Sequence, residues 1–147
     1  MTDDELIAAF ESTELPAEQF SHEAHVRVAW WYLRATSLPD ALTRFSTGLR
    51  RFATAKGAPH KYHETITVAY LLLIAERLER GRDLDWREFA AANRDLLRRT
   101  PSVLSKYYTE ALLGSDRARV EFVLPDRREI AFVSGTHAPS RRPSHAD

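Results

Sequence analysis

The stretch from Tyr62 to Arg80 limits the folds open to this chain more than any other part of the sequence. Its most apolar part runs from Ala69 to Ala75, and the flanking positions are also rich in apolar residues. A helix built from this stretch is apolar over most of its circumference, and such a helix is stable in water only when other elements cover it. The sequence therefore predicts a central helix over residues 62–80, which Gly81 ends.

Capping residues followed by apolar residues at helical spacing predict further helices before and after this central helix. The capping residues are Thr2, Ser21, Ser37, Asp85 and Ser115. The helix after Ser21 is expected to run to about Ala35, and Gly57 is placed to end the helix after Ser37. A shorter helix is expected from Ser102 to about Leu113.

The predicted fold is all-α, a single-domain bundle of five to seven helices around the central one, because no strand-rich stretch appears before residue 129. The packed domain is expected to cover residues 1–126. Residues 127–147 are predicted to form an extended or disordered tail. Within it, Ile130 to Val133 could form one short strand or lie extended, and the residues from Gly135 onward offer little to bury.

The composition excludes several classes of protein and site. The 147 residues include 21 basic and 21 acidic side chains, so no net charge attracts nucleic acid or an anionic membrane. The absence of cysteine excludes disulfides, thiolate zinc sites and cysteine nucleophiles. No glycine-rich phosphate loop and no Gly-x-Ser-x-Gly motif is present, so no nucleotide cofactor is expected.

The sequence also carries no targeting or membrane signal. The acidic start, Met1 to Glu5, differs from the basic and apolar start of a secretory signal. The longest apolar run, Val68 to Ala75, is far shorter than the ~20 residues that a membrane span needs. We therefore expect a cytoplasmic protein with no membrane or nucleic-acid partner, whose partner is a small-molecule substrate.

Two polar clusters at expected helix starts hold the candidate functional residues. One is the segment 21–25, which contains His22 and His25, and the other is Tyr62-His63-Glu64. His22 and His25 are neighbours on a helix surface because they are three residues apart. Since neutral imidazole is the commonest protein metal ligand, we expect the two helix starts to face each other, with His63 adding a third nitrogen.

The first functional hypothesis is a metal-dependent enzyme that acts on a small molecule by a hydrolytic or an oxidative reaction. The three histidines would hold a divalent transition metal (zinc, iron, copper or nickel), since nitrogen ligation without thiolate suits all four. Glu64 would be a fourth ligand or a general base, and Tyr62, the second catalytic residue, would donate a hydrogen bond to the bound substrate. Tyr108 and Arg27 would bind the substrate.

Two other hypotheses stay open, because each of these residues also has an ordinary structural explanation. In the second, a metal-free enzyme uses His63 and Glu64 for acid–base chemistry, while His22 and His25 bind an anionic substrate. In the third, a non-catalytic helical module binds a small molecule or a protein through the Trp30-Trp31 face. Exposed aromatic residues would also allow a homodimer.

A set of short motifs resembles a known pattern over about residues 10 to 126. The motifs are Phe10-Glu11, Leu15-Pro16, Phe20-x-His22-x-x-His25-x-x-x-Ala29-Trp30 and Tyr62-His63-Glu64-Thr65-x-Thr67, followed by Leu96-Leu97, Tyr107-Tyr108 and Pro125-Asp126. With them the chain resembles a family of small, largely uncharacterised bacterial all-helical proteins. The resemblance implies that Glu11, the three histidines, Tyr62 and Glu64 form one signature and share a site. Glu11 would orient a metal-binding imidazole.

Overall fold

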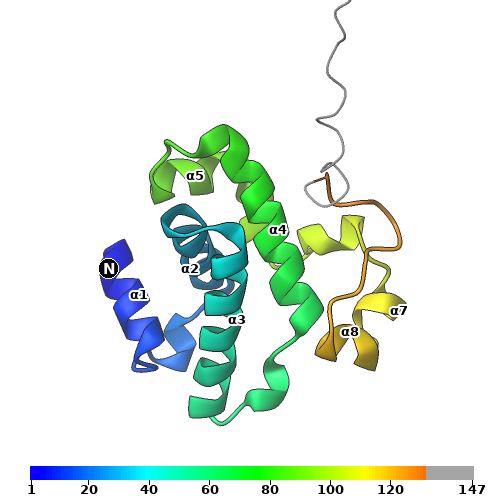
Figure 1. Ribbon diagram of the computed structural model, residues 1–147, viewed down its shortest axis with the longest axis horizontal. Coiled ribbons are helices and arrows are strands. Elements are labelled where there is room, and N and C mark those ends of the chain that lie inside the picture. The colour runs from blue at the N-terminus through cyan, green and yellow to red at the C-terminus, as the bar shows by residue number, and fades with distance from the viewer. Residues whose placement is uncertain (132–147) are drawn as a thin grey trace, which may run out of the picture.

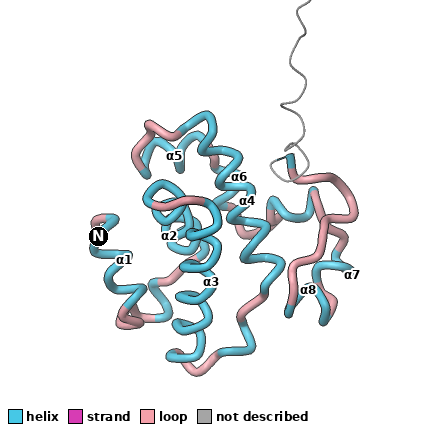
Figure 2. Tube along the Cα trace, in the orientation of Figure 1, coloured by secondary structure: helices cyan, strands magenta, loops and turns pink. Residues whose placement is uncertain are grey.

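The computed structural model describes residues 1–131, which form helices and loops and contain no strand (Figures 1 and 2). The α-helices are α1 (Asp3–Glu11), α2 (His22–Ala35), α3 (Leu38–Ala55), α4 (Glu64–Gly81), α5 (Trp86–Ala92), α6 (Arg94–Leu97), α7 (Glu110–Leu113) and α8 (Asp116–Val120), with the short 3₁₀ helices η1 (Ala17–Gln19), η2 (Pro59–Lys61) and η3 (Val103–Lys106). The prediction of an all-α fold is confirmed. Most of the predicted tail, including Val133, lies outside the described residues.

Helix α4 is the centre of the structure. Leu71, Leu73, Ile74 and Leu78 have no exposed surface. In Figure 1, α4 passes between α2 and α3 on one side and the C-terminal helices on the other, and it packs against α2, α3, η3 and α8. The expected central helix is therefore present. Neither α4 nor any other helix within residues 1–131 is long and apolar enough to cross a bilayer.

The predicted helix starts agree with the structure where a local capping bond defines them. The hydroxyl of Ser21 accepts the backbone N–H of Ala24 at 3.2 Å, and α2 runs from His22 to Ala35 as expected. Complete capping boxes begin α1 at Thr2 and α5 at Asp85. These starts depend on residues three positions apart, so the sequence alone specifies them.

The end of α3 also follows the prediction. Gly57 lies just after it with a φ of 75°, a left-handed conformation that glycine adopts without the steric penalty of a Cβ atom.

Two expected helices have different limits in the structure. Helix α4 begins at Glu64, and His63 is its N-cap instead of a residue in its first turn. The segment 102–113 forms two short helices, η3 and α7, instead of one. The break occurs at Thr109, whose hydroxyl caps α7 and whose backbone N–H and hydroxyl both donate to Asp126. This contact joins residues far apart in sequence, so helical periodicity could not predict it.

The segment after α8 lies against α4 and continues the packed domain beyond residue 126. The buried hydroxyl of Thr65 donates to the carbonyl of Glu121 at 2.9 Å and accepts the N–H of Val123 at 3.2 Å. Ile130 is only 1% exposed. The core therefore extends past the predicted boundary at residue 126 and includes at least Ile130.

Helices α1 and α3 approach closely at Gly48, which lies inside α3 and faces the ring of Phe10 from α1. A Cβ atom built on Gly48 would lie 2.9 Å from Cε2 of Phe10, closer than van der Waals contact allows. Phe10 itself has no exposed surface, and its ring lies 5.1 Å from that of Phe20 and 5.7 Å from that of Phe52. Its surroundings leave it little room to move.

We predict that Gly48→Ala lowers the free energy of unfolding by about 1–3 kcal/mol, because overpacking outweighs the better helix propensity of alanine. Urea unfolding monitored by circular dichroism would measure this change. Thr47→Ala, on the exposed side of α3, is the matched control and should be neutral or slightly stabilising. A Gly48→Ala protein as stable as the control would show that Phe10 can adjust without loss.

Candidate functional site

His22 and His25 lie together at the start of α2, and each ring donates one N–H to a backbone carbonyl. The Nε2 of His22 lies 2.9 Å from the carbonyl oxygen of Leu96, and the Nδ1 of His25 lies 2.9 Å from that of Ser21. A carbonyl oxygen only accepts hydrogen bonds, so these two nitrogens carry the protons. The Nδ1 of His22 and the Nε2 of His25 therefore each have a lone pair.

These two lone pairs remain open to solvent. Within residues 1–131, the only fully buried side-chain nitrogen or oxygen without a hydrogen-bond partner is Nε1 of Trp30. The free nitrogens of His22 and His25 also have no partner among these residues, so both must contact solvent.

Both rings are neutral at pH 7. Burial lowers the pKa of His25 to about 4, and its ring stacks on that of Phe20 with centroids 3.8 Å apart. Burial also lowers the pKa of His22, whose ring meets the edge of the Tyr70 ring at 5.1 Å. The charge of Arg99 contributes to lowering both pKa values. Neutral imidazoles are the form that binds metal ions.

His63 differs from His22 and His25, because both of its ring nitrogens have hydrogen-bond partners within the fold. Its Nδ1 accepts the N–H of Ile66 at 3.1 Å, which caps α4, and its Nε2 donates to the carbonyl of Leu113 at 2.8 Å. Burial lowers the pKa of His63 and keeps the ring neutral, as the capping bond requires. The ring thus connects the first turn of α4 to α7.

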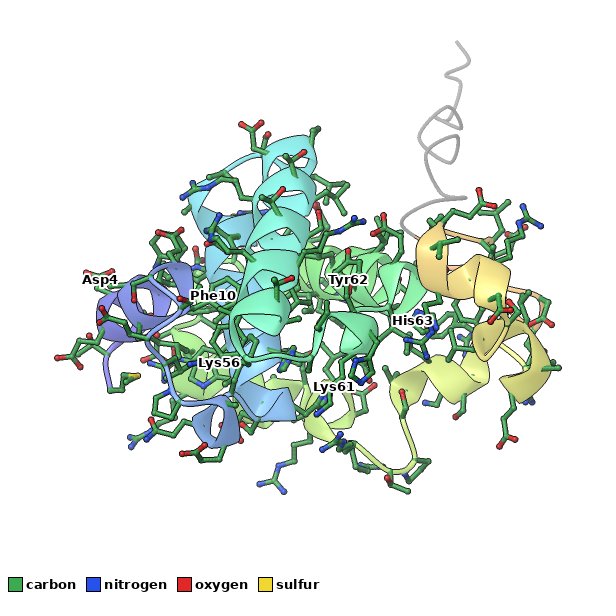
Figure 3. The ribbon with its side chains drawn as sticks, turned by 90° about the horizontal axis from the view of Figure 1, so that it is seen from below. Asp4, Phe10, Lys56, Lys61, Tyr62 and His63 are labelled. Atoms are coloured by element: carbon green, nitrogen blue, oxygen red, sulfur yellow. The ribbon has the colours of Figure 1, made fainter. Side chains whose placement is uncertain are left out.

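The expected convergence of the three imidazoles is not present in this arrangement. His63 lies on the side of α4 that faces the C-terminal helices (Figure 3), whereas His22 contacts α6 and Tyr70. Within the described part of the chain, no group of three or more His, Cys, Asp or Glu side chains is placed to hold a metal ion. His22 and His25 are brought together, and His63 is separated from them.

Tyr62 and Glu64 form a cluster with Arg50 of α3. The Tyr62 hydroxyl donates to Oε1 of Glu64 at 2.6 Å, and Nη2 of Arg50 donates to the same oxygen at 3.0 Å. The guanidinium of Arg50 also lies 4.5 Å from the centre of the Tyr62 ring. Burial and the bond to Glu64 raise the pKa of Tyr62 to about 12, so its proton is held firmly.

The same arrangement occurs a second time on α3. Glu11 accepts the Tyr32 hydroxyl at 2.5 Å and Nη2 of Arg44 at 3.3 Å on one oxygen, and the Arg44 guanidinium lies 4.9 Å from the Tyr32 ring centre. Glu11 therefore binds Tyr32 and Arg44 instead of orienting an imidazole as expected. Because both clusters join α3 to neighbouring elements, a structural role explains Tyr62 and Glu64 as well as Glu11.

The two predicted substrate-binding residues also have partners within the fold. Tyr108 is 2% exposed, and its hydroxyl donates to the carbonyl of Val123 at 2.7 Å. Arg27 forms an ion pair with Asp3 at 2.6 Å and donates to the carbonyl of Met1. Tyr108 therefore belongs to the core, and Arg27 joins α2 to the start of α1.

Sequence reasoning missed the carbonyl of Leu96 and the ring of Tyr70, which set the orientation of His22. The sequence pattern carries no signal for a carbonyl partner, because any residue supplies one.

The family resemblance receives no support from comparison with other proteins, since no known protein family, curated protein or solved structure matches the chain.

The dual role of His63 leads to a prediction that separates its two bonds. His63→Ala removes both bonds, whereas the shorter side chain of His63→Asn still caps α4 and no longer reaches Leu113. We expect His63→Ala to lose about 1–2 kcal/mol of local stability at the Ile66 amide, and His63→Asn to retain that protection. Both variants should increase amide hydrogen exchange across α7. Equal exchange at Ile66 in the two variants would contradict this role.

His25 should make the stability of the protein depend on pH. Its pKa in the fold is about 4, below the ~6.5 of an unfolded chain, so the unfolded state binds the additional proton between these values. Stability should therefore fall as the pH drops from ~6.5 to ~4, by up to about 3 kcal/mol from this residue. His25→Asn, which keeps a donor for the Ser21 carbonyl, should show a shallower pH dependence in urea unfolding. If the free energy of unfolding of His25→Asn changed with pH as steeply as that of the wild type, His25 would not be the source of this pH dependence.

Proposed function

We propose that the chain is a metal-dependent enzyme acting on a small molecule, with its site at the start of α2. His22 and His25 would hold a divalent transition metal through Nδ1 and Nε2. The supporting observation is that each ring donates its other N–H to a carbonyl. In metal sites this second bond fixes the tautomer and orientation of an imidazole ligand.

Two protein ligands would leave several coordination positions for water and substrate. A metal held in this way polarises a bound carbonyl or lowers the pKa of bound water. This proposal omits His63 and Glu64 from the ligand set of the sequence hypothesis, because His63 caps α4 and Glu64 binds Tyr62 and Arg50. Zinc, iron, copper and nickel all suit imidazole ligands. A cytoplasmic location is part of the same proposal.

A metal-free site is the second candidate, and the position of Arg99 favours it. The charge of Arg99 acts on both His22 and His25, and a positive charge there opposes a bare cation and attracts an anion. In this alternative, Arg99 binds an anionic substrate beside His22 and His25. His22 then acts as a general base, and its lone pair accepts a proton from the bound substrate.

Titration with Zn²⁺, followed by calorimetry and by ¹⁵N signals of the imidazole rings, tests the first candidate. A background with His137→Ala and His145→Ala removes two histidines outside the described residues. His22→Ala and His25→Ala should each weaken Zn²⁺ binding by at least about tenfold, since even an outer partner of a ligand contributes that much. His60→Ala, an exposed histidine on η2, is the matched control and should bind normally.

Zn²⁺ binding that survives both site variants would exclude this ligand set. Inorganic phosphate provides the complementary test. If Zn²⁺ does not bind, and phosphate shifts the ring signals of His22 and His25 in the wild type and not in Arg99→Gln, the metal-free alternative replaces the first candidate.

A further inference from the structure

The end of α2, the start of α3 and the end of α4 together form a concave surface with an apolar floor. One pocket of about 180 Å³ is lined by Leu33, Leu38, Ala75 and Leu78, with Arg82 and Glu79 among the residues at its polar edge. These residues come from three helices and from the turn between α2 and α3. The site lies at the opposite end of α2 from His22 and His25 and is independent of the function proposed for them.

A second pocket adjoins the first at Arg82. It has a volume of about 280 Å³ and is lined by Trp31, Arg34, Ala35 and Arg82. Because Arg82 belongs to both pockets, they form one continuous surface. Trp31 contributes an aromatic wall, which is half-buried, whereas Trp30 points into the core against Trp86.

The charge on this surface is positive. Among residues 1–131, neither Arg34 nor Arg82 forms an ion pair with a carboxylate. Arg34 lies over the ring of Trp30, 4.6 Å from its centre. Glu79 is the one carboxylate among the lining residues, so one positive charge remains in excess. An anionic group placed between the two arginines would gain charge-assisted hydrogen bonds.

The size of the surface limits what it can bind. Each pocket taken alone is smaller than the ~300 Å³ at the lower end of ordinary ligand sites, and a ligand that spans both meets Arg82 between them. We propose that this surface binds a small monocarboxylate with an apolar tail. The tail would lie against half-buried Leu38 and the small exposed parts of Leu33 and Ala75, and the carboxylate would bind Arg82 and Arg34.

Hexanoate is a suitable probe, tested on the full chain by titration with ¹H–¹⁵N NMR. Hexan-1-ol and hexylammonium carry the same tail with a neutral or a positive head. We expect saturable shifts confined to residues 31–38 and 75–82, with hexanoate binding about tenfold more tightly than hexan-1-ol. Hexylammonium should bind most weakly. Equal affinities for the three probes, or shifts spread over the whole chain, would overturn the proposal.

Two charge variants identify the carboxylate contact. Arg82→Gln and Arg34→Gln should each weaken hexanoate binding by about tenfold, the loss expected for one charge-assisted hydrogen bond, and leave hexan-1-ol binding unchanged. Arg80→Gln, an exposed residue on α4 that lines neither pocket, is the matched control. Hexanoate binding that is insensitive to both variants, or as sensitive to the control, would also overturn the proposal.

Discussion

The structure depends on the burial of α4 from nearly all directions. Leu71 and Leu73 lie on different sides of the helix and are both without exposed surface. A helix with this property cannot lie at an edge, so the remaining helices must arrange themselves around it. The candidate sites accordingly lie at the ends of α4 and on the helices that cover it, where the histidines and the pockets occur.

The three histidines illustrate how backbone partners decide what an imidazole can do. All three are neutral, because burial lowers each pKa below its usual value. In His63 the lone pair accepts the Ile66 N–H, so the ring is part of the scaffold. In His22 and His25 the bond to a carbonyl uses only the protonated nitrogen, and the lone pair is left for a ligand. Residue type alone does not distinguish these two uses.

Features set by neighbouring residues could be predicted from the sequence, and features set by distant contacts could not. The caps at Ser21 and Asp85 and the centrality of α4 follow from local spacing and hydrophobicity. The break of segment 102–113 required knowledge that Thr109 meets Asp126. The supposed convergence of His63 with His22 failed for the same reason, because Leu113 and Leu96 are partners that no sequence pattern reveals.

The two Glu–Tyr–Arg clusters hold α3 to its neighbours on two flanks. Arg44 reaches Glu11 on one flank of this helix, and Arg50 reaches Glu64 on another. Each residue inserted between the two arginines would turn one of them by about 100° relative to the other. An insertion there would therefore break at least one of the two clusters.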